Sequence, residues 1–150
     1  MTQAPPPQRT IRALIATGDD NIQELVESVL TDATKGHASL EVHAPRSTRE
    51  KALRDLARRF QFDVFTVTLN NVLYPATERD PLTEKLQSSV ALVRDLVQLY
   101  SKPVVGIYGW PDGPEYPDRV IEAGAAAVLR MPFKRQQLRD AITDALALAP

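Results

Sequence analysis

The chain has 150 residues, of which 43% are hydrophobic and 25% charged, and these values are those of one globular domain. The formal net charge of −1 argues against a surface dominated by contacts with nucleic acid or anionic membrane, and the absence of cysteine excludes disulfides, thiolate metal sites and a cysteine nucleophile. No apolar run approaches the ~18 residues of a membrane span, and no signal-peptide core occurs. We therefore expect a cytoplasmic protein.

The chain opens on a proline-rich stretch, which a strand and a helix follow. Residues 1–9 include three consecutive prolines and few apolar side chains, which predicts a disordered tail before a domain over residues 10–150. Residues 11–16 form a nearly continuous apolar run, typical of a strand that is buried on both faces. Apolar residues spaced three and four apart over residues 22–33 predict a helix, which Gly36 ends.

Two further strand-and-helix units follow. Residues 40–44 form the second predicted strand, and Ser47 and Glu50 have the spacing of a capping box that begins the second helix. Residues 63–70 are rich in β-branched and aromatic side chains, which predicts a central strand. A long polar connection over residues 71–80 then leads to the third helix.

The last part of the chain repeats the alternation. Residues 104–108 and 126–129 are the fourth and fifth predicted strands, separated by a short helix that ends near Gly124. A final helix presents apolar side chains over residues 138–146. Five strands alternating with five helices, joined by right-handed crossovers, predict a flavodoxin-like α/β fold: a doubly wound three-layer sandwich whose parallel sheet has strand order 2-1-3-4-5.

In such a sheet the functional site lies at the carboxyl ends of the strands, beside the switch point between strands 1 and 3. The segments delivered there are residues 17–21, 68–71, 108–110 and 130–133.

The closing part of the domain resembles a known family. Residues 121–133 read IEAGAAAVLRMPF and precede a helix, and they are similar to the "EAGA…YLxKPF" segment that closes response-regulator receiver domains. Residues 14–15 and 21–25 resemble the opening segment of the family, and residues 63–65 resemble the start of its third strand. The resemblance covers residues 10–148.

The resemblance implies functional positions that phosphotransfer requires. Two adjacent acids after strand 1 hold Mg²⁺, an aspartate ending strand 3 accepts the phosphoryl group, a Ser/Thr after strand 4 reads the phosphate, and a lysine pairs with it. Counting from Asp63 places Thr68 at the acceptor position, and counting back from Pro75 places Asn71 there instead. Neither is a carboxylate, and no Asp or Glu occurs between residues 64 and 76.

The other positions also lack the residue types that the family has there. Thr17 and Gly18 stand in place of the acid pair, Tyr108 in place of the Ser/Thr, and Met131 in place of the lysine. The positions that correspond to the receiver pocket are Thr17, Gly18, Asp19, Asp20, Thr68, Asn70, Asn71, Tyr108 and Met131.

These departures predict a degenerate receiver, or pseudo-receiver, with no enzymatic activity, metal or cofactor. We expect Thr17, Thr68, Asn70, Asn71 and Tyr108 to hydrogen-bond with one another in a neutral site. We interpret Asp19 and Asp20 as caps of the first helix rather than metal ligands. The resemblance also implies a cis peptide bond between Met131 and Pro132, because X-Pro bonds tolerate the cis form.

The function predicted from these features is that of a signalling or scaffolding module that binds a protein partner of a signalling or assembly pathway independently of phosphorylation. The partner-binding face implied by the resemblance is formed by the fourth predicted helix, the fifth strand and the fifth helix. Homodimerisation through that face is a further hypothesis; nucleic-acid binding and membrane insertion are not expected. Trp110 is interpreted either as a lid on the sheet edge or as a partner anchor. The candidate partner-binding residues are Trp110, Tyr116, Ile121, Arg130, Pro132, Phe133 and Arg135.

Two alternatives remain open. One is a small-molecule binding domain of the same fold, with a nucleotide or a cobalamin-like ligand in the crevice lined by Thr and Asn. Residues 17–23 contain no histidine, which argues against base-off cobalamin. The other alternative is a residual phosphoswitch that uses Asp19 or Asp20 in an unexpected register.

Overall fold

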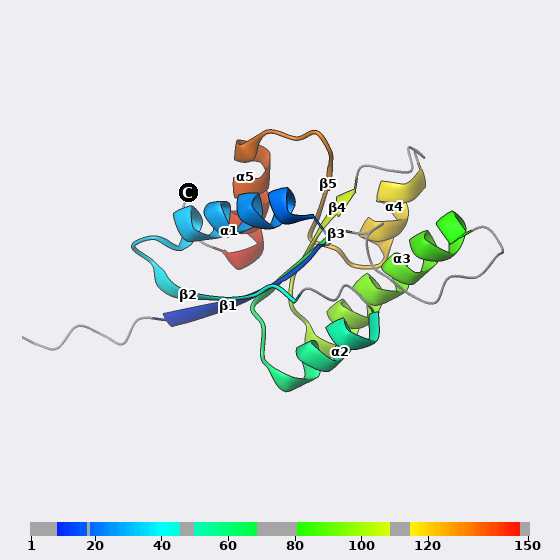
Figure 1. The fold of residues 1–150 in the computed structure, drawn as a ribbon, viewed down its shortest axis with the longest axis horizontal. Helices are drawn as coiled ribbons and strands as arrows, with labels where there is room; N and C mark the ends of the chain where they lie inside the picture. The colour runs from blue at the N-terminus through cyan, green and yellow to red at the C-terminus, as the bar shows by residue number, and fades with distance from the viewer. Residues whose placement is uncertain (1–8, 18, 46–49, 69–80, 109–114, 148–150) are drawn as a thin grey trace, which may run out of the picture.

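The computed structural model describes residues 9–17, 19–45, 50–68, 81–108 and 115–147. Strands and helices alternate along the chain, as the sequence predicts (Figure 1). The elements are β1 (Arg9–Ala16), α1 (Asp20–Thr34), β2 (Ala38–His43), α2 (Glu50–Arg59), β3 (Val64–Thr68), α3 (Pro81–Tyr100), β4 (Val104–Tyr108), α4 (Glu115–Glu122), β5 (Ala127–Arg130) and α5 (Arg135–Leu146).

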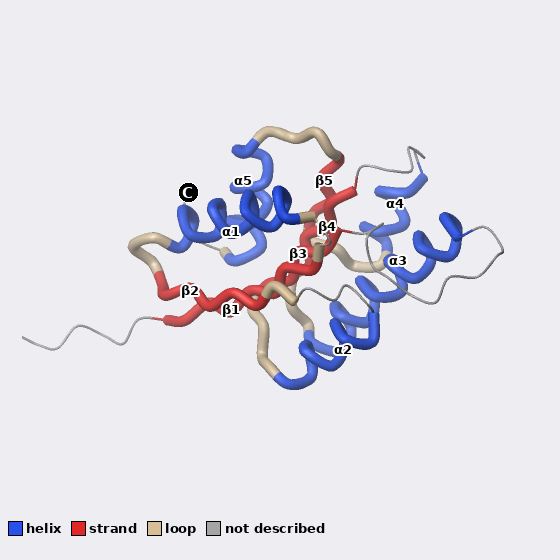
Figure 2. The backbone as a smooth tube through the Cα atoms, in the orientation of Figure 1, coloured by secondary structure: helices blue, strands red, loops and turns tan. Residues whose placement is uncertain are grey.

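The five strands form one parallel sheet in the order β2-β1-β3-β4-β5, which confirms the predicted topology. Figure 2 shows the sheet between two layers of helices, with α1 and α5 on one side and α2, α3 and α4 on the other. The fold is therefore the predicted three-layer α/β sandwich.

Each face of the sheet buries its own apolar core, because successive side chains of a strand point to opposite faces. Ile11, Ala13 and Ile15 of β1 pack toward α1 and α5, in a cluster with Val26, Leu30, Leu138 and Ile142. Phe65 and Val67 of β3 pack on the other face, in a cluster with Leu53, Leu92, Leu96 and Val120.

The central strands are more deeply buried than the edge strands. All residues of β3 and β4 are buried, whereas β2 and β5 contain only half-buried and exposed residues. A strand that packs under helices on both faces must be apolar on both, which explains why β3 and β4 read as continuous β-branched and apolar runs in the sequence.

The observed element bounds differ from the predicted ones by a few residues. Arg9, which we placed in the tail, belongs to β1 and pairs with Ala38 at the start of β2. The central strand ends at Thr68, and residues 69–70 lie outside the described residues. So do the rest of the predicted tail, residues 1–8, and the predicted capping residue Ser47. Within the described part of the chain, no helix is long and apolar enough to cross a membrane.

Candidate functional site

The carboxyl ends of three strands meet at one edge of the sheet. Thr17 directly follows β1, Thr68 is the last residue of β3, and Tyr108 is the last residue of β4. The pairings Ala16–Val67 and Thr68–Ile107 place these strand ends side by side. The residues are 6%, 2% and 7% exposed respectively. This edge is the one at which the sequence predicted a site, and its three buried polar side chains are all uncharged.

The hydroxyl groups of Thr17 and Thr68 differ in their hydrogen bonding among the described residues. Oγ1 of Thr17 accepts a hydrogen bond from the backbone N–H of Asp19 at 3.2 Å. Oγ1 of Thr68, in contrast, is buried and has no hydrogen-bond partner among the described residues. The same holds for Oγ1 of Thr66, two residues earlier on β3. The network that we predicted for this edge therefore stays a prediction. Asn70 and Asn71, which we expected to join the network, lie outside the described residues, as does Gly18.

Asp19 is the N-cap of α1, as predicted. Its Oδ1 accepts hydrogen bonds from the backbone N–H groups of Asn21 at 2.8 Å and Ile22 at 3.1 Å. Asp20 follows as the acidic residue of the first helical turn, where it interacts favourably with the helix dipole. The described residues contain no group of three or more His, Asp or Glu side chains placed to hold a metal ion.

The connection between β5 and α5 closes one side of the site. The backbone N–H of Met131 donates to the carbonyl oxygen of Tyr108 at 2.7 Å, which joins this connection to the end of β4. The Met131–Pro132 peptide bond is cis, as the resemblance implied. Met131, which the sequence analysis placed at the lysine position of the family, therefore lies beside Tyr108.

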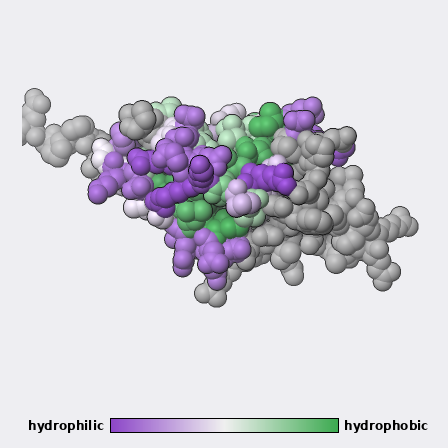
Figure 3. All heavy atoms as spheres, turned by 90° about the horizontal axis from the view of Figure 1, so that it is seen from above, coloured by the Kyte–Doolittle hydropathy of each residue, from purple (hydrophilic) through white to green (hydrophobic). Residues whose placement is uncertain are grey.

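A surface groove of about 530 Å³ runs between this connection and the first two turns of α1. Figure 3 views the molecule from the side of α1 and α5 and shows apolar side chains gathered between hydrophilic ones on this face. The lining residues are mostly apolar, with two polar residues at the rim: Ile22, Leu25, Met131, Pro132 and Phe133, and then Asp19 and Asn21.

The structure divides the predicted partner-binding residues between two places. Pro132 and Phe133 line the groove, and Arg135 points toward α1, where its Nη2 lies 3.4 Å from Oδ2 of Asp32. Ile121, 48% exposed, lies on α4, and Arg130 is an exposed residue at the end of β5. Tyr116 belongs to α4, and Trp110 lies outside the described residues.

Ile22 and Leu25 are groove residues that sequence analysis did not select. Their spacing assigns them to the buried stripe of α1, and nothing in that periodicity separates a residue under the sheet from one at the edge of the helix. Only the position of Pro132 and Phe133 beside the first turns of α1 shows that this end of the stripe lines a groove.

Comparison of the sequence finds no matching family model and no matching curated protein. Comparison of the fold finds response regulators and receiver domains. A response regulator from Thermotoga maritima matches with a TM-score of 0.69 and 14% identity, over 92% of this chain and 98% of that one. A CheY-like receiver domain protein from Methanospirillum hungatei matches with a TM-score of 0.65 and 19% identity, over 92% and 94%.

A third match is a candidate pilus assembly protein from Burkholderia thailandensis, with a TM-score of 0.63 and 17% identity over 91% of this chain and 98% of that one. Identities this low establish a common fold and leave function to be argued from the site. The strand order and these matches show that the chain has the flavodoxin-like α/β fold, which it shares with CheY-like receiver domains.

Proposed function

We propose that this domain is a pseudo-receiver: a signalling or scaffolding module that binds a protein partner without aspartyl phosphorylation. The observation that carries the proposal is Thr68 at the end of β3. The resemblance places the acceptor aspartate of the family at Thr68 or at Asn71, and neither residue is a carboxylate. Phosphoryl transfer to a receiver forms an acyl phosphate on a carboxylate oxygen. Thr68 provides only a hydroxyl group, on a side chain that is 2% exposed.

The surroundings of Thr68 support the same proposal. Thr17 and Tyr108 are neutral, and Met131 contributes a thioether in place of an ammonium group. A buried lysine is stable only beside an opposite charge, so the loss of the carboxylates and the loss of the lysine are electrostatically consistent with each other. The carboxylate of Asp19, two residues after Thr17, accepts two backbone hydrogen bonds as a helix cap.

The groove between α1 and the β5–α5 connection is the docking surface that we assign to this module. Leu25, Met131 and Phe133 are half-buried in this groove, and Pro132 is exposed. Burial of their remaining apolar surface against a partner would remove that surface from water. Pro132 and Phe133, two of the predicted partner-binding residues, contribute to the groove. We expect the partner to insert an apolar side chain between Leu25 and Phe133.

Treatment with acetyl phosphate, or with beryllofluoride and Mg²⁺, tests the loss of phosphorylation. We expect no adduct with the mass of one phosphoryl group and no change in the amide NMR spectrum. A phosphorylatable receiver treated in parallel is the positive control. A stoichiometric adduct, or a spectral change centred on Thr68, would contradict the proposal.

A pair of charge-introducing variants tests the docking surface. Leu25→Arg places a cation in the groove, and Ile121→Arg places the same cation on α4, outside the groove. A partner identified with the wild-type domain and then purified should bind the Ile121→Arg variant normally and the Leu25→Arg variant at least tenfold more weakly. The opposite pattern would move the docking surface to α4, and circular dichroism of both variants controls for folding.

A further inference from the structure

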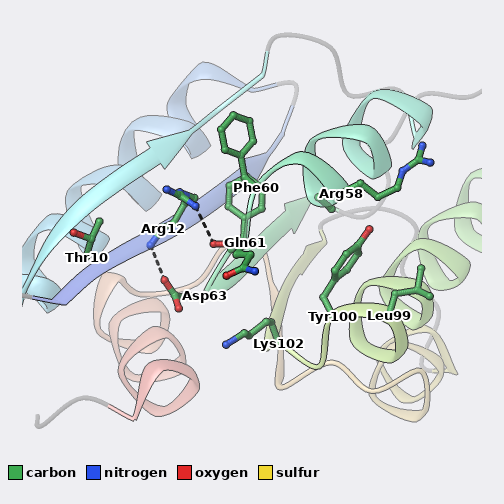
Figure 4. A pocket seen from close by; sticks show the side chains of 11 residues that line it. Thr10, Arg12, Arg58, Phe60, Gln61, Asp63, Leu99, Tyr100 and Lys102 are labelled. Carbon is green, nitrogen blue, oxygen red and sulfur yellow. Dashed lines mark hydrogen bonds between the residues drawn. The ribbon is translucent and has the colours of Figure 1, made fainter.

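A second pocket opens at the opposite end of the sheet, where the strands begin. It has a volume of about 660 Å³ and lies between the start of β1, the α2–β3 connection and the α3–β4 connection (Figure 4). Pockets of this volume are common for bound small molecules. Since it lies at the far end of the strands from Thr68, the inference drawn from it is independent of the proposed function.

Cations outnumber carboxylates around this pocket. Arg12, Arg58 and Lys102 come from three separate segments and line it, whereas Asp63 is the one carboxylate among the described residues that line it. Because the net charge of the whole chain is −1, this excess of positive charge is a local feature. Such a concentration of cations raises the local concentration of anionic ligands.

The carboxylate of Asp63 is already engaged by the protein. Its Oδ2 accepts a hydrogen bond from the backbone N–H of Arg12 at 2.8 Å, and its Oδ1 lies 3.8 Å from Nη2 of Arg9. Asp63 therefore repels an incoming anion less than a free carboxylate would. Glu41, the nearby acid on β2, is engaged in the same way by Arg12 and His43.

Lys102 is in the opposite situation. Its side chain is exposed, and among the described residues it forms no ion pair or hydrogen bond. Within the described ranges of the chain, Arg58 pairs only with Asp55 on the same exposed helix surface, a contact of small net energy. Lys102 is therefore the cation with most capacity to bind an anion at this pocket.

Phe62 and Tyr100 form an aromatic wall of the pocket, and both rings pack against Phe65 in the core. Phe62 contacts Phe65 with ring centroids 5.6 Å apart, and Phe65 contacts Tyr100 at 6.2 Å. Figure 4 shows Tyr100 directed into the pocket from the end of α3, with Gln61 on the facing connection. An aromatic ring supported by the core provides a stacking surface, and an exposed amide provides both a donor and an acceptor for a polar ring.

We propose that this pocket binds a nucleoside phosphate. Lys102 contacts the phosphate, Tyr100 packs against the ring of the base, and the amide of Gln61 hydrogen-bonds with the base. The combination carries the proposal: a bare anion needs only the cations, whereas a pocket of this volume with an aromatic wall and an adjacent amide accommodates a ring as well.

Titration of the isotope-labelled domain with AMP and GMP, followed by amide NMR, tests the proposal. We expect saturable shifts at Gln61, Tyr100 and Lys102, which weaken as salt is raised. Lys102→Gln should weaken binding about tenfold, since it removes one charge-assisted contact. Gln61→Ala should weaken binding of the nucleotides and leave the response to inorganic phosphate unchanged.

Lys35→Gln is the matched control, because it removes the same charge from an exposed lysine at the end of α1, outside the pocket. Binding should be unchanged in that variant. The proposal is wrong if neither nucleotide shifts the pocket residues, if Lys102→Gln and Lys35→Gln have equal effects, or if inorganic phosphate binds as tightly as AMP. Tighter binding of an acidic peptide than of either nucleotide would identify the pocket as a protein-docking site instead.

Discussion

A Cβ atom on Gly124 would lie 2.9 Å from Cγ1 of Val97, so α4 ends beside α3 at a position where a side chain does not fit. Gly124 has φ +110°, and its N–H donates to the carbonyl oxygen of Ile121 while the N–H of Ala125 donates to that of Val120. These two bonds are those of a Schellman motif with glycine at its C′ position. The glycine of the receiver-like EAGA segment is therefore a helix stop.

We predict that Gly124→Ala lowers the free energy of unfolding by about 3 kcal/mol, since it combines an unfavourable φ with a steric clash. Gly36→Ala is the matched control: Gly36 has φ +81°, and no atom lies within 4 Å of a Cβ placed there. Gly36→Ala should lower the free energy of unfolding by about 1 kcal/mol. Urea unfolding measures both, and equal losses would show that the contact with Val97 relaxes without cost.

A second prediction concerns Asp19, the N-cap of α1. Asp19→Ala leaves the N–H groups of Asn21 and Ile22 without their acceptor and should lower the free energy of unfolding by about 1 kcal/mol. Asp19→Asn keeps a side-chain oxygen in the same place and should retain most of that stability.

The same two variants separate capping from metal binding by Asp19. A capping role predicts that Mg²⁺ leaves the melting temperature of the wild-type domain and of both variants unchanged. Stabilisation of the wild type by Mg²⁺ that Asp19→Asn abolishes would assign the carboxylate to a metal site.

Thr66 and Thr34 provide a matched test of buried hydroxyl groups. Both side chains are 2% exposed, but Oγ1 of Thr34 donates to the carbonyl oxygen of Leu30 at 2.8 Å, whereas Oγ1 of Thr66 has no partner among the described residues. Replacement by valine exchanges the hydroxyl for a methyl group in each. Thr66→Val should raise the free energy of unfolding by about 1 kcal/mol, because it removes an unpaired buried polar group.

Thr34→Val should lower it by a similar amount, about 1 kcal/mol, because it removes a formed hydrogen bond. Chemical denaturation of the two variants under one set of conditions measures the difference. If Thr66→Val destabilises the domain as much as Thr34→Val does, the Thr66 hydroxyl has a hydrogen-bond partner, such as a buried water.

Glu41 is expected to titrate at unusually low pH. The hydrogen bond from His43, at 3.0 Å, and the ion pair with Arg12 hold the pKa of Glu41 below its ordinary value of 4.5. Because the pKa is lower in the folded than in the unfolded state, ionised Glu41 stabilises the fold above the unfolded-state pKa. That stabilisation is lost as the pH falls through the folded-state value.

Carboxyl-carbon NMR measures the pKa of Glu41 directly. We expect His43→Ala to raise it toward the ordinary value, and Glu41→Gln to reduce the loss of stability on acidification. A Glu41 pKa that does not respond to His43→Ala would show that the 3.0 Å contact does not persist in solution.

Local patterns in the sequence were sufficient to predict the fold. The continuous apolar runs at residues 104–108 and 11–16 predicted strands covered on both faces, and the spacing from Ile22 to Ala33 predicted a helix. These patterns are informative because burial requires a period of two in a strand and 3.6 in a helix. The capping role of Asp19 is equally local and could be assigned before the structure was known, whereas the sequence left Thr68 and Asn71 as alternatives for the acceptor position.

Contacts between distant segments could be decided only by the tertiary structure. Arg12 and Asp63 are 51 residues apart, and their hydrogen bond depends on how β1 pairs with β3, which no spacing along the chain encodes. Contacts between distant segments also determine the groove beside Phe133, the pocket around Lys102 and the environment of the Thr66 hydroxyl. A periodic pattern predicts whether a side chain is buried or exposed. The particular neighbours of that side chain are determined by strand register and by the packing of helices across the sheet.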